Sequence, residues 1–88
     1  MKELIIMQYI NKISKEDVYE FGIKNGIKLN NNSLDIIYNY VKNDWRTIIF
    51  GDITPIFNDL KNKLDSNTFN KIKNLYFEFK EKYKNYLQ

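Results

Sequence analysis

Apolar residues recur along this chain three and four positions apart, which is the spacing of one face of an α-helix. Ile6, Ile10 and Ile13 follow one another at i, i+4 and i+7 and predict a helix over residues 1–13. A second clear stripe predicts a helix that starts near residue 33 and ends near residue 43. Its members are Leu34, Ile37, Tyr38 and Val41.

Residues that start and stop helices divide these stripes into segments. Ser14 is a good N-cap for a helix that ends at about Lys24. Gly26 is suited to end that helix, because glycine readily adopts the left-handed conformation of a C-cap. Thr54 followed by Pro55 predicts the start of another helix, since proline is favoured at the first helical position.

The last segment is the longest of the predicted helices. Asp65 and Ser66 are suited to cap its first turn. Its apolar residues alternate in steps of three and four, so we expect a straight stripe that faces the core along the whole helix. The stripe consists of Phe69, Ile72, Tyr76, Phe79, Tyr83 and Tyr86.

Three features depart from this helical pattern. Residues 27–29 alternate as an extended segment, and residues 47–50 are β-branched and apolar, so we expect residues 44–51 to lie extended across the core. Residues 47–49 could pair briefly with residues 27–29. Gly22 stands inside the buried stripe of the second helix, beside Val18 and Phe21, which predicts a close approach of another helix.

These elements predict one domain over residues 1–88. With 43% hydrophobic and 16% aromatic residues, the chain can form an apolar core. The predicted fold class is all-α: a compact bundle of about five short helices with a long C-terminal helix.

The chain contains no His and no Cys, so imidazole bases, thiol nucleophiles, thiolate zinc sites and disulfides are all excluded. The acidic group Glu16, Asp17 and Glu20 lies in the first turns of a helix, where the helix dipole favours carboxylates. No set of convergent catalytic residues is evident. We therefore expect no enzyme activity, no cofactor, no metal site and no small-molecule substrate.

Basic residues are concentrated in the last third of the chain. Residues 61–88 hold 7 Lys and 3 Asp or Glu, although the whole chain has a net charge of only +3. No apolar run approaches the roughly 20 residues that a membrane-spanning helix needs. We expect a cytoplasmic protein that does not associate with a membrane.

The candidate interaction surface lies on one flank of the last helix. There Phe77 is surrounded by Lys73, Lys80 and Lys84, and Trp45 with Arg46 forms a second aromatic and basic pair. Aromatic rings between lysines suit phosphate contact and base stacking. The same pattern is typical of a solvated amphipathic helix, or of a protein-binding or self-association surface that uses Phe77, and all three interpretations remain open.

Two resemblances follow from the order of these elements. The run from Ile13 to Asp17, the turn from Gly26 to Leu29 and the segment 71–79 resemble a family of small uncharacterised helical proteins of low-GC Gram-positive bacteria, a domain of unknown function. That resemblance implies a fold and no catalytic residue. Residues 14–43 are similar to the helix–extended–helix modules of the SAP and LEM type, several of which bind DNA. Those modules carry basic residues in the extended loop, whereas residues 30–35 here are neutral to acidic.

The sequence therefore predicts a non-enzymatic helical protein that binds another macromolecule. The partner is expected to be a protein or a second copy of the chain. The alternative is nucleic-acid binding, either through the basic and aromatic flank of the last helix or through residues 14–43.

Overall fold

The computed structural model describes residues 2–87, with side chains through residue 86, so that residues 1 and 88 lie outside the described part. Within this part the protein is all-α, as expected. Its helices are α1 (Lys2–Lys12), α2 (Lys15–Lys24), α3 (Asn31–Phe50), α4 (Thr54–Lys63) and α5 (Ser66–Leu87).

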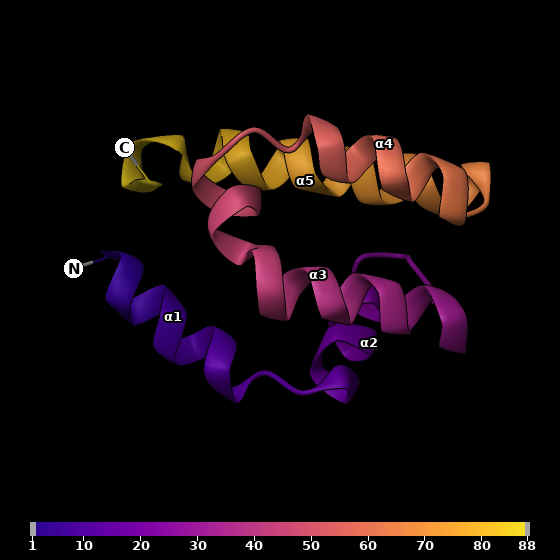
Figure 1. The fold of residues 1–88 in the computed structure, drawn as a ribbon, viewed down its shortest axis with the longest axis horizontal. Helices are drawn as coiled ribbons and strands as arrows, with labels where there is room; N and C mark the ends of the chain where they lie inside the picture. Colours follow the sequence, from indigo (N-terminus) through magenta and orange to yellow (C-terminus); the bar gives the residue numbers. More distant parts are fainter. Residues whose placement is uncertain (1, 88) are drawn as a thin grey trace.

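The helices form a bundle around α3 (Figure 1). Helices α4 and α5 run antiparallel along one side of α3, and α2 packs against the other side. Helix α1 contacts α3 and diverges from α5, so the two ends of the chain lie on the same side of the molecule (Figure 1). Helices α1 and α5 therefore both contact α3, but they do not run alongside each other.

Most of the predicted helix starts are confirmed. Ser14 forms a capping box with Asp17, in which each side chain accepts a hydrogen bond from the backbone N–H of the other residue, at 3.0 and 2.9 Å. Asp65 accepts a bond from the backbone N–H of Thr68 at 2.9 Å. Helix α4 also starts at Thr54 as expected, although the Thr54 side chain does not cap it; the Thr54 N–H instead donates to the carboxylate of Asp52 at 3.0 Å.

The predicted extended segment at residues 44–51 is also wrong. Helix α3 continues to Phe50 through a kink at Asp44, whose φ and ψ are −125° and 23°. Trp45 and Ile48 lie three positions apart, so in a helix both side chains face the interior. The free energy gained by burying them outweighs the β preference of the segment. Residues 27–29 have no strand partner among the described residues, so the pairing with residues 47–49 does not form.

The largest apolar cluster joins α3, α4 and the first half of α5. Its buried members are Ile56, Leu60, Leu64 and Phe69. The half-buried residues packed against them come from α3, α4, the turn before α4 and the first half of α5 as far as Ile72. No side chain of α1 takes part in this cluster, and neither does any described side chain of α5 beyond Ile72.

The other buried apolar residues belong to α1, α2, α3 and the turn between α2 and α3. They are Ile10, Val18, Ile27, Leu29 and Trp45. Phe21 was expected to be buried with Val18 but is exposed, because only a narrow stripe of α2 faces α3. The prediction that another helix approaches Gly22 is wrong, because the backbone that comes close to it belongs to Ile27 in the turn after α2.

A hydrogen bond from the Tyr40 hydroxyl to the Asp59 carboxylate joins α3 to α4. This bond, with burial and nearby negative charge, raises the pKa of Tyr40 to about 12 from 10.0. The same bond, with that from Lys63, lowers the pKa of Asp59. The pKa of Tyr40 is higher in the folded state than in the unfolded chain. The contribution of the hydroxyl to folding stability is therefore complete below pH 10.0 and is lost as the pH rises toward about 12.

We therefore expect Tyr40→Phe to lower the urea midpoint of unfolding at pH 7. The difference between parent and variant should shrink between pH 10 and 12, because the parent alone then loses this bond. The difference should also shrink in acid, as the pH falls through the lowered pKa of Asp59. A difference that stays constant from pH 7 to 12 would show that the bond does not stabilise the fold.

Candidate functional site

Trp45 and Arg46 join α1 to α3. The Trp45 side chain is buried, with 6% of its surface exposed, so it is not part of a binding surface. The Arg46 guanidinium lies 4.4 Å from the centre of the Trp45 ring, and its Nε donates to Glu3 Oε1 of α1 at 3.3 Å. These contacts give the pair a structural role, since they hold the N-terminal half of α1 against the kinked end of α3.

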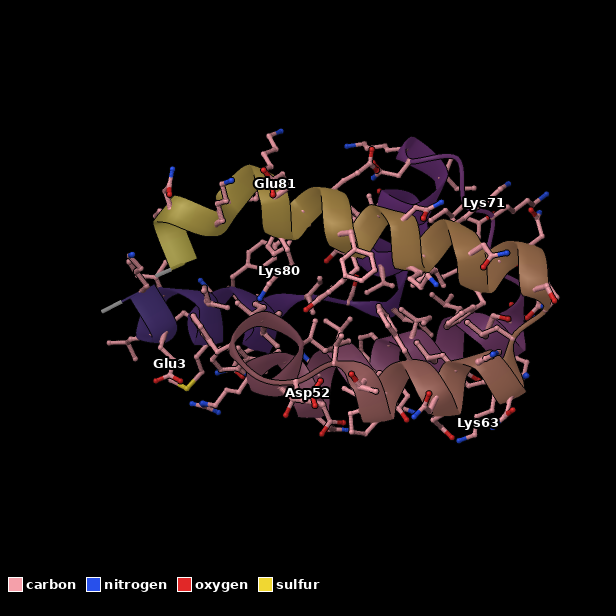
Figure 2. All side chains as sticks on the ribbon, turned by 90° about the horizontal axis from the view of Figure 1, so that it is seen from above. Glu3, Asp52, Lys63, Lys71, Lys80 and Glu81 are labelled. Atoms are coloured by element: carbon pink, nitrogen blue, oxygen red, sulfur yellow. The ribbon has the colours of Figure 1, made fainter. Side chains whose placement is uncertain are left out.

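The three lysines predicted around Phe77 do not form a free basic patch. Lys80 points into the protein (Figure 2), where its Nζ donates to the carbonyl oxygen of Ile49 at 2.6 Å and so caps the end of α3. Lys84 forms an ion pair with Glu81 at 2.8 Å. The Nζ atom of Lys73 lies 5.8 Å from the centre of the Phe69 ring, and this side chain is half-buried.

Phe77 is exposed, with 54% of its surface accessible. Its ring forms one edge of an aromatic cluster: it contacts Phe57 with the ring centres 6.1 Å apart, and Tyr76 with the centres 5.4 Å apart. Phe57 in turn contacts Phe69 and Tyr76 edge to face. Phe77 therefore extends the packing between α4 and α5 outward to the solvent.

An open groove lies between α5 and the turn that follows α2. Its volume is about 940 Å³. Lys71 closes one end of it by donating from Nζ to the carbonyl oxygen of Gly26 at 3.3 Å. Side chains of both charges line the groove together with Leu75 and Phe77, so it is a mixed polar and apolar surface.

The structure exposes an apolar surface that the sequence pattern assigned to the core. The stripe of α5 leaves the core after Tyr76, and Phe79, Tyr83 and Tyr86 are 37 to 50% exposed. Ile5 and Tyr9 of α1 are exposed to a similar or greater extent. We call these five residues the α1/α5 face.

The lengths of the two packed helices account for this exposure. A helix of 22 residues is about 33 Å long, whereas its antiparallel neighbour α4 has 10 residues and spans about 15 Å. The second half of α5 therefore extends beyond the helix that covers the first half. A uniform apolar stripe on a helix that outruns its neighbour is typical of an incompletely covered surface.

The carboxylates whose pKa values are clearly lowered include three that lie at helix starts. Hydrogen bonds to Ser14, Thr54 and Thr68 lower the pKa values of Asp17, Asp52 and Asp65, as expected for carboxylates in caps. Burial raises the pKa of Tyr76. Among residues 2–86, no three acidic side chains come together in a way that could hold a metal ion.

Each helix within residues 2–87 is too short or too polar to span a lipid bilayer. Comparison of the sequence with protein-family models, with curated proteins and with solved structures found no match. The resemblances to a helical domain of unknown function and to SAP and LEM modules therefore stay predictions.

Proposed function

We propose that this chain is a non-enzymatic protein-interaction module of the cytoplasm and that the α1/α5 face is its binding surface. The observation that supports this proposal most directly is the exposure of Ile5, Tyr9, Phe79, Tyr83 and Tyr86. Tyrosine and phenylalanine are enriched at protein interfaces, where they bury a large area at a small cost in side-chain entropy.

Nucleic-acid binding has weaker support. Phosphate contacts need lysine or arginine side chains that reach solvent together on one surface. The ammonium groups of Lys73, Lys80 and Lys84 instead contact an aromatic ring, a backbone carbonyl and a carboxylate within the chain. The apolar character of the α1/α5 face is better matched to a protein partner.

Site-specific photocrosslinking in the cells that make the protein tests this proposal. Benzoylphenylalanine replaces Tyr83 on the α1/α5 face in one variant and replaces Asn62, an exposed residue of α4, in a control variant. We expect ultraviolet light to produce protease-sensitive adducts heavier than the free chain from position 83, and few or none from position 62.

Adducts of equal yield from both positions would contradict the proposal, because they would indicate random collisions rather than a binding surface. Absence of adducts at both positions would contradict it as well. Adducts that disappear on nuclease treatment would favour the nucleic-acid alternative. The adduct mass then separates two kinds of partner: another protein, or a second chain of 10.7 kDa.

A further inference from the structure

The α1/α5 face is shared by two helices. Helices α1 and α5 meet at their outer ends, where Lys2 Nζ lies 5.1 Å from the centre of the Tyr86 ring. Ile5 and Tyr9 follow Lys2 at i+3 and i+7, and therefore lie on the same side of α1. The two helices diverge from that contact (Figure 1), so the exposed residues of α1 and the aromatic stripe of α5 lie on helices that separate along their length.

Helix α3 contacts both helices. Its Arg46 reaches α1 through Glu3, and its Ile49 carbonyl accepts the hydrogen bond from Lys80 of α5. The aromatic stripe of α5 includes Phe79 and Tyr83, whose ring centres lie 5.0 Å apart. Because the stripe is exposed, it is accessible to a partner.

The surface area of the chain indicates the size of the missing contact. The accessible surface is 6208 Å², whereas a folded monomer of 10.7 kDa is expected to expose about 5,500 Å². The excess of about 700 Å² is close to the roughly 800 Å² that each partner buries in a standard interface. Burial of one interface of standard size would reduce the accessible surface to about the area expected for a folded protein of this mass.

The charges beside the aromatic stripe are self-complementary. Glu78 and Lys82 lie one turn apart on the flank of α5 that borders Phe79 and lines the open groove. They form no ion pair with each other in the described residues, and the Lys82 Nζ lies 5.6 Å from the centre of the Tyr83 ring. If two α5 helices cross antiparallel with a two-fold axis level with Lys80, residue 78 of each lies opposite residue 82 of the other.

We propose that the partner is a second copy of this chain. Two α5 helices pair antiparallel through Phe79, Tyr83 and Tyr86, and each packs against Ile5 and Tyr9 in α1 of the other copy. Glu78 of each chain pairs with Lys82 of the other. This inference rests on the proposed function, and it specifies the partner.

Sedimentation of the full chain between about 1 and 200 µM tests the inference, since an interface of this size typically gives micromolar or tighter affinity. We expect the parent to sediment as a dimer. Tyr83→Glu should weaken association by about 100-fold, because it places a charge at the centre of the apolar contact. The matched control Phe77→Glu, on the other side of the helix, should change it by less than about threefold.

A charge exchange tests the antiparallel register. Glu78→Lys and Lys82→Glu should each weaken dimerisation roughly fivefold, because each disrupts two exposed ion pairs. The double variant restores opposite charges across the two-fold axis and should recover the affinity of the parent. Circular dichroism of every variant checks that the helical fold is intact.

A monomeric parent over the whole concentration range would overturn the inference. So would dissociation by Phe77→Glu without dissociation by Tyr83→Glu, or a double charge variant as weak as the single ones. A monomeric parent together with adducts to a different protein at position 83 would leave the proposed function standing. Absence of both dimer and adducts would overturn both.

Discussion

Trp45→Ala is expected to lower the free energy of unfolding by about 4 kcal/mol, the usual cost of truncating a large buried aromatic side chain. Trp45 is 6% exposed and its ring also carries the Arg46 guanidinium. Loss of the ring leaves a cavity beside the kink of α3 and removes the surface against which Arg46 is held toward Glu3. Helix α1, which has no residue in the main apolar cluster, should loosen first.

The measurement is a urea titration followed by circular dichroism, with Phe77→Ala as the matched aromatic control. Phe77 is 54% exposed, so its truncation should cost about 1 kcal/mol or less. A Trp45→Ala midpoint equal to that of Phe77→Ala would show that the tryptophan is not a core anchor. In the parent, fluorescence of this sole tryptophan should shift to the red together with the loss of helix.

Gly22→Val is expected to destabilise the fold by about 3 kcal/mol, because there is no room for a side chain at this position. A β-carbon there would lie 2.7 Å from the carbonyl oxygen of Ile27, which belongs to the backbone and cannot rotate away. The approach is fixed by a second bond, since the Ile27 N–H donates to the Gly22 carbonyl at 2.8 Å. The substitution therefore separates α2 from the turn that follows it.

The Gly22→Ala variant distinguishes the effect of the steric clash on stability from the effect of helix propensity. In an open helix, alanine would stabilise by about 1 kcal/mol relative to glycine. At this position the clash of the β-carbon should outweigh that gain, so a net loss of about 1 to 2 kcal/mol is expected. Exposed Asn62→Gly in α4 is a useful comparison, because it introduces the propensity cost without any clash. A more stable Gly22→Ala variant would contradict the close approach.

Local signals in the sequence were sufficient for most helix boundaries. The capping box of Ser14 and Asp17, the cap at Asp65 and the left-handed Gly26, with a φ of 78°, all depend on a few neighbouring residues. Such short-range hydrogen bonds form in the same way in many folds. The segment 44–51 could not be predicted in this way, because its helix depends on the packing of Trp45 and Ile48 against distant segments.

For the candidate surface, too, local sequence pattern predicted some features and tertiary contacts determined the others. The periodicity placed Phe77 correctly on the outside of its helix, but it could not show that Lys80 reaches the carbonyl of Ile49, 31 positions away. The burial of Trp45 also depends on contacts with distant segments. Conversely, the stripe ending in Tyr83 and Tyr86 has the same spacing as the buried stripe before it, although its exposure differs.

The sequence by itself determined the helical class, the caps and the absence of imidazole and thiol chemistry, since each follows from residue type and near neighbours. Only the tertiary structure decided which apolar stripes are covered. A hydrophobic periodicity specifies that a face prefers burial, but burial requires a second surface at the same place. In this protein α4 is much shorter than α5, so the apolar stripe in the second half of α5 stays exposed.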